Sequence, residues 1–186
     1  MRIISGNFKG KKIYQPLDKN TRPLRDMVKE SIFNLLIHSN KLNFEINKSN
    51  ILDLFSGSGS FGLECASRGA NKVILVENYL NILSILRKNV KFIDSKNICE
   101  IIEQDCFEFL KINSYPKNKF DLIFIDPPYK EKKINFLINK IKENKILENK
   151  GIIIIHRHKK DDIKISEKLK IIDQRTYGIS KIIIGN

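Results

Sequence analysis

One stretch, from Asn50 to Glu77, constrains the fold of this 186-residue chain more than any other. It opens with a short apolar run that contains one acid, Asp53, and continues into a turn of Gly and Ser residues. A helical pattern follows from Phe61 to about Arg68, and a second apolar run, Val73 to Val76, ends on Glu77. The order of strand, glycine turn, helix and strand predicts the first half of a doubly wound α/β sheet.

The same stretch has the composition of a nucleoside site. A turn without bulky side chains lets the backbone approach a ligand, and the following helix points its first N–H groups at that ligand. A carboxylate at Glu77 can accept hydrogen bonds from two ribose hydroxyls. The buried Asp53 needs polar partners and is expected to organise the glycine turn. The spacing of Gly57, Gly59 and Gly62 suits a dinucleotide equally well.

A second stretch, Asp126 to Tyr129, favours a different ligand from a dinucleotide. It follows the buried-strand pattern of residues 120–125 and contains two prolines, which make a stiff, extended corner. The carbonyl of Pro127 lacks a local donor, Asp126 is an acceptor when ionised, and Tyr129 offers a flat face for stacking. Together these groups would hold a planar aromatic amine, which is what methylation of an exocyclic amino nitrogen requires.

These two stretches resemble the class I S-adenosylmethionine-dependent amino methyltransferases, through Asp53 to Gly59 and through Asp126 to Tyr129. The N-terminal segment is similar to the bacterial 16S rRNA guanine-N2 methyltransferases, the guanine-966 enzymes. The segments that carry this second resemblance are Met1 to Gly6, Lys9 to Lys12, Thr21 to Pro23 and Val28 to Asn34. The resemblance covers nearly the whole chain.

The resemblance implies S-adenosylmethionine as cofactor, S-adenosylhomocysteine as product, and no metal. It implies Asp126, Pro127 and Tyr129 as catalytic residues acting on the N2 atom of a guanine in 16S rRNA. The expected cofactor residues are Asp53, Phe55, Ser56, Gly57, Gly59, Glu77, Asp105 and Cys106. In the family pattern an acid at Asp105 accepts from the adenine amino group, and the same side chain could cap the helix that begins at Cys106.

The formal net charge of +13 favours a polyanionic partner such as nucleic acid. An AT-rich genome, which enriches Lys, Ile and Asn, is the alternative explanation of that charge. The first 30 residues hold eight Lys and Arg against three Asp and Glu, which suits a segment that grips RNA. The expected RNA-binding residues are Arg2, Lys9, Lys11, Lys12, Arg22, Pro128 and Tyr129. The expected partner is the assembled or nearly assembled small ribosomal subunit.

The length favours one domain over residues 1–186. Residues 1–24 are predicted to form a basic hairpin flap, with residues 2–5 paired to 11–14, and residues 25–186 the catalytic core. The core is predicted to be a Rossmann-like sheet of seven strands, mostly parallel, with an antiparallel C-terminal edge. A helix is expected over residues 162–169, and a final hairpin pairs 170–174 with 177–184.

The three cysteines have no metal-ligand spacing, no segment is long enough to span a membrane, and the N-terminus lacks a secretory pattern. A monomer in the cytoplasm is therefore expected. His156 and His158 flank Arg157 near a point where the family often carries an acid, so no catalytic role is assigned to His156.

Three other functions are less consistent with these residues. A DNA adenine-N6 methyltransferase shares the proline corner but usually needs a separate target-recognition segment, and none is visible. An RNA-binding assembly factor without catalysis would not need Asp126. A nicotinamide-dependent enzyme would leave Asp126 to Tyr129 without a purpose.

Overall fold

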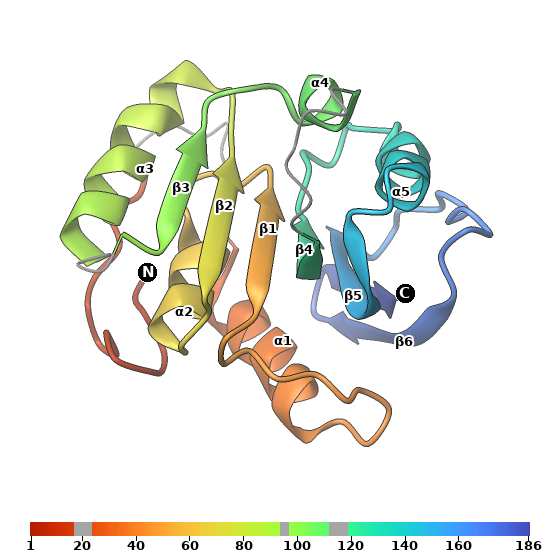
Figure 1. The fold of residues 1–186 in the computed structure, drawn as a ribbon, viewed down its shortest axis with the longest axis horizontal. Coiled ribbons are helices and arrows are strands. Elements are labelled where there is room, and N and C mark those ends of the chain that lie inside the picture. The colour runs from red at the N-terminus through yellow and green to blue at the C-terminus, as the bar shows by residue number, and fades with distance from the viewer. Residues whose placement is uncertain (17–23, 94–96, 112–118) are drawn as a thin grey trace.

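The computed structural model describes residues 1–16, 24–93, 97–111 and 119–186, and is built around one seven-stranded sheet of order β3-β2-β1-β4-β5-β7-β6 (Figure 1). Its strands are β1 (Asn50–Leu54), β2 (Lys72–Val76), β3 (Cys99–Ile102), β4 (Phe120–Ile125), β5 (Leu147–His158), β6 (Ile171–Tyr177) and β7 (Ser180–Gly185). Strands β1 to β5 pair in parallel, and β7 runs antiparallel to both β5 and β6. The predicted mostly parallel sheet with an antiparallel C-terminal edge is confirmed.

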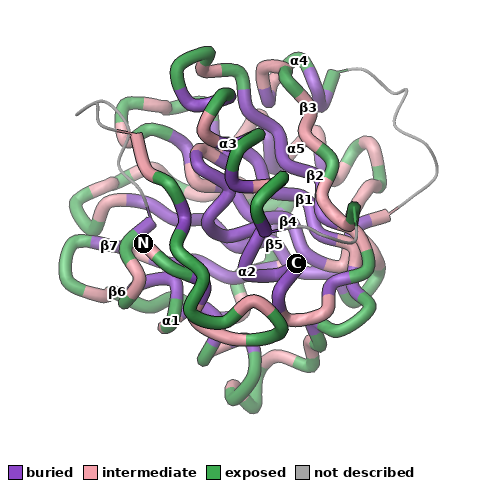
Figure 2. The backbone as a smooth tube through the Cα atoms, turned by 90° about the vertical axis from the view of Figure 1, so that its left-hand side faces the viewer, coloured by how far each residue is buried: buried purple, intermediate pink, exposed green. Residues whose placement is uncertain are grey.

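Helices cover both faces of the sheet. They are α1 (Asp26–His38), α2 (Ser60–Ser67), α3 (Leu80–Ile93), α4 (Cys106–Lys111) and α5 (Ile134–Glu143). Alternate strand residues enter two separate cores, because successive side chains of a strand point to opposite faces. Ile51, Val73 and Phe124 pack with α1, α2 and α3, whereas Leu52 and Ile123 pack with α4 and α5. Figure 2 shows the sheet buried at the centre of the molecule.

The chain order reverses between β1 and β4, which lie side by side in the middle of the sheet. Ligands of open α/β sheets bind beyond the carboxyl ends of the strands at such a switch point. The glycine turn follows β1 and the proline corner follows β4. The fold therefore brings together the glycine turn and the proline corner, which are about 70 residues apart in sequence.

Two elements near the C-terminus differ from the sequence prediction. Residues 161–166 have no regular secondary structure instead of the helix predicted over 162–169. Ile163 and Ile165 both pack against the core on the α5 face, and a separation of two residues places side chains on one side only in an extended chain. The final hairpin turns at Gly178, where φ is +60°, so β6 continues beyond the predicted end at Gln174.

The N-terminal segment, residues 1–16, folds back on itself with a single antiparallel bridge between Arg2 and Lys12 instead of a long ladder. Backbone hydrogen bonds from Ile3 N to Lys11 O (2.9 Å) and from Ile13 N to Met1 O (3.0 Å) complete the hairpin. Ile3 and Ile13 bury their side chains against α2 and α3.

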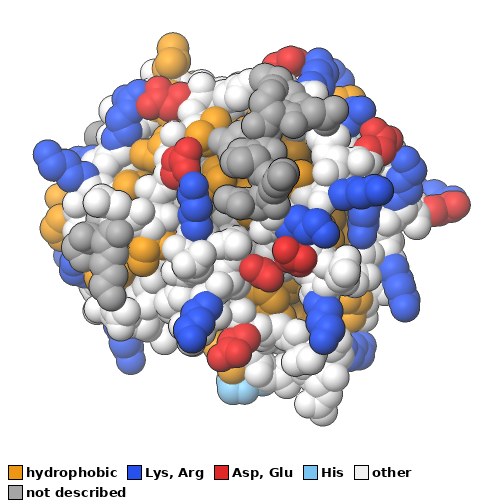
Figure 3. Space-filling view, viewed as in Figure 1, with side chains coloured by type: hydrophobic (Ala, Val, Ile, Leu, Met, Phe, Trp, Pro, Cys, Tyr) orange, Lys and Arg blue, Asp and Glu red, His pale blue; other side chains and the backbone are white. Residues whose placement is uncertain are grey.

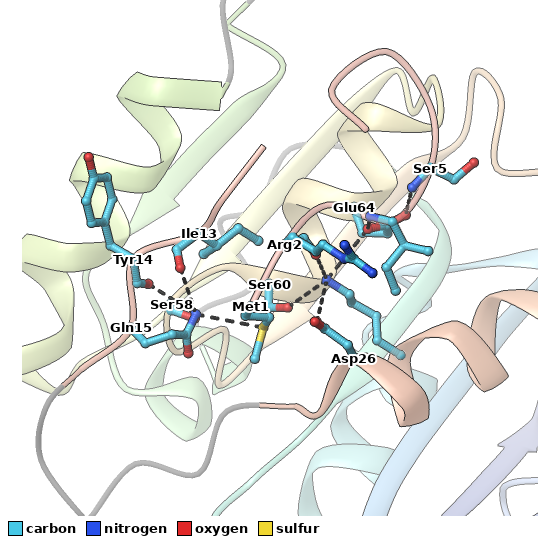
Figure 4. Close-up of polar contacts among 12 residues, drawn as sticks. Met1, Arg2, Ser5, Ile13, Tyr14, Gln15, Asp26, Ser58, Ser60 and Glu64 are labelled. Atoms are coloured by element: carbon cyan, nitrogen blue, oxygen red, sulfur yellow. Dashed lines mark hydrogen bonds and ion pairs between the residues drawn. The ribbon is translucent and has the colours of Figure 1, made fainter. Parts of the chain in front are cut away.

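Buried polar groups attach this segment to the helices (Figure 4). The carboxylate of Glu64, in α2, accepts from the backbone N–H groups of Ile4 (2.7 Å) and Ser5 (2.9 Å). The ammonium of Lys29, in α1, donates to Arg2 O (2.8 Å), and burial lowers its pKa although Glu64 and Asp26 raise it. Asn89, in α3, binds both the N–H and the carbonyl of Tyr14.

Candidate active site

Three residues in the corner after β1 have positive φ angles, a backbone conformation that most residues avoid. Phe55, Gly57 and Gly59 have φ values of +61°, +56° and +80°. A Cβ atom added at Gly57 would meet nothing within 4 Å, so the backbone there is open to a ligand. A Cβ atom at Gly62 would lie 2.4 Å from Leu75 Cδ2, so Gly62 serves the packing of α2 on β2. Of the three glycines in the spacing motif, Gly57 is therefore the one suited to contact a cofactor.

Glu77, directly after β2, is held in place by three backbone N–H groups. Its Oε2 accepts from Gly57 N (2.7 Å), and its Oε1 accepts from Asn78 N and Tyr79 N (both 2.9 Å). A carboxylate has about four acceptor sites, so one remains at Oε2, facing the glycine turn. That free site fits a ribose hydroxyl.

Asp53 lies beneath the same corner and is 1% exposed. Its Oδ2 accepts from Gly62 N (3.0 Å), which ties β1 to the first turn of α2. Burial raises the pKa of this carboxyl well above its usual range, and the negative charges of Asp126 and Glu77 raise it further, against the hydrogen bond from Gly62. The carboxyl of Asp53 is thus hydrogen-bonded to the first turn of α2, and the raised pKa favours its protonated form in the folded protein.

The raised pKa predicts how Asp53→Asn changes stability with pH. The stabilisation from the protonated carboxyl is complete below the unfolded-state pKa and is lost as pH rises through the folded-state pKa. As pH rises between these two pKa values, the free energy of unfolding of the wild type should therefore fall relative to that of Asp53→Asn, by at most about 1.4 kcal/mol per pH unit. Urea titrations between pH 4 and pH 9 measure the difference. Exposed Asp162→Asn is the control, and an equal slope in both variants would contradict the prediction.

Asp105, the acid after β3, caps the start of α4, which is one of the two roles that the sequence left open for it. Asp105 Oδ1 accepts from Phe107 N (2.8 Å) and Glu108 N (3.2 Å) at the start of α4, while Oδ2 accepts from Asn78 Nδ2 (3.1 Å). Cys106 accepts from Phe55 N at Sγ (3.3 Å), and burial raises the pKa of its thiol so that it stays neutral. Both residues border the glycine corner.

The corner after β4 presents two acceptors. Asp126 N donates to Leu54 O (3.4 Å), which places Asp126 beside the last residue of β1. Its Oδ1 lies 2.7 Å from His156 Nδ1, while Oδ2 has no hydrogen-bond partner among the described residues. The carbonyl of Pro127 likewise accepts no hydrogen bond from the described residues. Asp126 Oδ2 and the carbonyl of Pro127 belong to consecutive residues at the switch point, and two such acceptors fit an amino group with two N–H donors.

The side chain of Arg157 holds the backbone of the proline corner through hydrogen bonds. Its side chain is 2% exposed, and its guanidinium donates to the carbonyls of Pro128 (3.2 Å), Tyr129 (3.1 Å) and Glu131 (2.9 Å). The fourth partner of the guanidinium is the carboxylate of Asp161. The planar guanidinium of Arg157 therefore fixes the backbone of Tyr129, whose side chain carries the ring.

Sequence reasoning missed two residues at this corner, His156 and Arg157. Both lie at the end of β5, the strand next to β4, and both are buried. The available signal was a run of three polar residues, His156 to His158, directly after the apolar residues 152–155. No catalytic role was assigned to His156 from the sequence, and in the structure each of its ring nitrogens has a hydrogen-bonding partner.

The expected RNA-binding residues of the N-terminal segment do not gather at this corner. Arg2, Lys9, Lys11 and Lys12 are exposed on the flank of the molecule, and Arg22 lies outside the described residues. Asn7 and Phe8 bind the last residue of α2, Ser67, so the loop with Lys9 and Lys11 lies at the opposite end of α2 from the glycine corner. Pro128 is exposed within the proline corner after β4. On the face shown in Figure 3, basic side chains are scattered among acidic ones.

Among the described residues, no group of three or more His, Cys, Asp and Glu side chains is arranged to bind a metal ion. Within that same part of the chain, none of the helices combines the length and the apolar character needed to cross a membrane.

Comparisons with known proteins agree with this geometry. A family model described as "Conserved hypothetical protein 95" matches residues 1–186. A Haemophilus influenzae protein named ribosomal RNA small subunit methyltransferase D is 33% identical over 182 residues, which is 96% of this chain and 90% of that protein. An Escherichia coli K12 protein of the same name is 30% identical over 155 residues, covering 83% of this chain and 73% of its own length.

Solved structures share the fold over the full length. An Escherichia coli protein described as a candidate methyltransferase, yhhF, has a TM-score of 0.82 at 24% identity, covering 100% of this chain and 96% of its own. A Haemophilus influenzae protein described as a candidate methylase, HI0767, has a TM-score of 0.78 at 30% identity, covering 100% and 97%. The chain belongs to the family described as Conserved hypothetical protein 95, together with the proteins named ribosomal RNA small subunit methyltransferase D.

Proposed function

We propose that this protein transfers a methyl group from S-adenosylmethionine to the exocyclic N2 atom of a guanine in 16S rRNA. The observation that carries the proposal is the pair of acceptors at the switch point, Asp126 Oδ2 and Pro127 O, which have no partner among the described residues. They lie beside a glycine corner that has the features of a nucleoside site. The relatives named ribosomal RNA small subunit methyltransferase D support rRNA as the substrate.

The residues divide into two groups around the two corners. The glycine corner, with Glu77 and Asp105, would hold the cofactor through backbone N–H groups and carboxylates. S-adenosylmethionine supplies an electrophilic methyl group when bound and leaves as S-adenosylhomocysteine. A guanine amino nitrogen is a poor nucleophile, because its lone pair is delocalised into the ring. Asp126 and Pro127 O would orient it and stabilise the positive charge that develops on it, while Tyr129 stacks on the base.

RNA binding would extend along the flank formed by residues 1–16 and α3. These two segments together hold seven Lys and Arg residues and no acid. The exposed rings of Tyr14 and Phe92 lie 6.1 Å apart, and ammonium groups contact both: Lys88 over Tyr14 (3.8 Å) and Lys11 over Phe92 (5.5 Å). Aromatic rings interleaved with lysines are suited to unpaired bases and phosphates. A helix of 14 residues spans about 20 Å, so RNA would contact the protein well beyond the target base.

Charge reversal on this flank tests the RNA surface. The double variant Lys11→Glu, Lys88→Glu should bind small subunits about 10-fold more weakly at moderate salt, and the slope of log affinity against log salt should fall by about two. Fluorescence titrations at several salt concentrations measure both quantities. Lys150→Glu, Lys170→Glu carries the same charge change at exposed positions elsewhere and should leave the slope unchanged. An equal loss in the two variants would show that only net charge matters.

The substrate is proposed to be the assembled or nearly assembled small subunit, in which the particle itself would present the target guanine to the two corners. It would act as a monomer in the cytoplasm without a metal. The decisive experiment incubates the protein with methyl-labelled S-adenosylmethionine and small subunits from a strain lacking the enzyme. We expect label on the N2 atom of one guanine of 16S rRNA, and much less label on a short naked RNA. Label on adenine N6 of DNA, or no label at all, would contradict the proposal.

A further inference from the structure

The ring of His156 joins three neighbouring strands through two hydrogen-bonding contacts. His156, near the end of β5, has its Nδ1 atom 2.7 Å from Asp126 Oδ1, directly after β4, and its Nε2 atom 2.9 Å from Ser180 Oγ, at the start of β7. The His156 side chain is 8% exposed and that of Asp126 is 18% exposed. The ring is therefore fixed on both sides and is reached from solvent only poorly.

The two contacts determine where the ring carries its proton. An ionised carboxylate only accepts hydrogen bonds, so Nδ1 must donate to Asp126. Nε2 then accepts from the hydroxyl of Ser180, whose O–H can turn toward it. The other neutral tautomer would set the Nδ1 lone pair against a carboxylate lone pair. Ser180 thus stabilises the tautomer that Asp126 requires, which is the ordinary way in which one ring nitrogen's hydrogen bond fixes the other.

The same contact leaves Asp126 with one oxygen for the substrate. Oδ1 is occupied by His156, whereas Oδ2 has no partner among the described residues. A carboxylate without such a contact could rotate about its Cβ–Cγ bond and present either oxygen. With the contact, Oδ1 is held by His156 and Oδ2 stays in one position. Fixing an acceptor in this way matters, because a displacement of about 1 Å in a reacting group can cost about 100-fold in rate.

We propose that His156, held by Ser180, is a positioning residue that aims Asp126 Oδ2 at the target amine; this rests on the function proposed above. His156 does not itself touch the substrate and takes no proton during the reaction. Neutral and protonated imidazole both donate through Nδ1, so the contact persists in either state. The nearby groups that face the ring are Asp126, Ser180 and the ring of Tyr129, whose centroid is 6.3 Å away.

Two substitutions of His156 separate positioning from packing. In His156→Asn the side-chain amide places an N–H donor at the position of Nδ1, so the contact with Asp126 is kept and the contact with Ser180 is lost. In His156→Gln the amide reaches the position of Nε2, so the contact with Ser180 is kept and that with Asp126 is lost. Single-turnover methylation of small subunits with labelled S-adenosylmethionine is measured for both, together with donor affinity and thermal stability.

We expect His156→Asn to stay within about 10-fold of the wild-type rate and His156→Gln to lose about 100-fold, with donor affinity unchanged in both. Equal losses in the two folded variants, or a smaller loss in Gln than in Asn, would overturn the inference, because packing or the Ser180 contact would then dominate. Wild-type rates in both would overturn it as well.

A measurement without substrate separates this inference from the proposed function. The ¹⁵N chemical shifts of the His156 ring in the wild-type protein report its tautomer directly. We expect the proton on Nδ1 at neutral pH, and a proton on Nε2 alone would overturn the inference. If the wild type transfers no label to small subunits but His156 shows the Nδ1–H form, the proposed function fails while the contact between His156 and Asp126 stands.

Discussion

Methyl transfer by Asp126→Ala is expected to fall by about 10³-fold, while the affinity for S-adenosylmethionine changes little. The substitution removes the acceptor that would orient the amine and stabilise its developing charge, and preorganised groups of this kind are worth about 10² to 10³ in rate. It leaves the glycine corner intact, because Asp126 has no contact with Gly57 or Glu77 among the described residues. Single-turnover rates with labelled cofactor and small subunits measure the loss, and isothermal titration measures cofactor affinity.

Glu77→Ala is expected to give the opposite result in the same assays, with cofactor affinity lowered and the rate of methyl transfer little changed. Glu77 accepts from three backbone N–H groups and would bind a ribose hydroxyl, so its loss should weaken cofactor binding and leave the rate at saturating cofactor close to that of the wild type. If both variants methylate normally, the site is misplaced. If both lose cofactor binding and rate in the same proportion, the division of the two corners into cofactor and substrate sides is wrong.

Arg157→Met is expected to lower the free energy of unfolding by about 3–5 kcal/mol at neutral pH, because it leaves a buried carboxylate without its partner. Three carbonyls, those of Pro128, Tyr129 and Glu131, lose a donor as well. Burial acts to raise the pKa of Asp161, but the N–H of Ile163 and the guanidinium of Arg157 outweigh it and lower the pKa. Denaturant titrations by circular dichroism measure the change.

The pH dependence distinguishes this effect from a simple loss of packing. A lowered carboxyl pKa contributes stability above the unfolded-state pKa, and that contribution is lost as pH falls through the folded-state pKa. The difference between wild type and Arg157→Met should therefore shrink in acid, where Asp161 is protonated. Arg175→Met is the control, because Arg175 is 51% exposed and its partner Asp173 keeps the ammonium of Lys41 at 3.4 Å, so its loss should cost less than about 1 kcal/mol. A pH-independent loss in Arg157→Met would point to packing alone.

Periodicity and turn residues predicted most of the fold, because the parallel strands contain mostly apolar runs and are separated by helices and turns. The sequence could not place the end of β6, since the positive φ that selects Gly178 as the turn depends on pairing with β7. The error over residues 162–169 has a similar cause. Their contacts to α5, such as Ser166 N to Asn135 Oδ1 (2.8 Å), replace the local hydrogen bonds of a helix.

The candidate site was predictable where chemistry lies in a contiguous motif and was missed where it depends on a neighbouring strand. Asp53, Glu77 and Asp126 each follow or end a strand, so their meeting at the switch point follows from the fold. His156 comes 30 residues after Asp126, and only the parallel register of β4 and β5 brings the two together. The run of polar residues at the end of β5 marks the position, but it does not identify Asp126 as the partner of His156.

The attachment of the N-terminal segment has a consequence for synthesis of the chain. Tyr14 is bound by Asn89, 75 residues later, and Ile4 by Glu64, 60 residues later. A growing polypeptide emerges from its N-terminus first, so Ile4 and Tyr14 cannot reach their final partners until residues 64 and 89 have been translated. Until then the apolar side chains of Ile3 and Ile13 remain exposed to solvent. Cleavage within residues 1–16 would leave the buried Lys29 and Glu64 without their backbone partners, so this segment is not a dispensable tail.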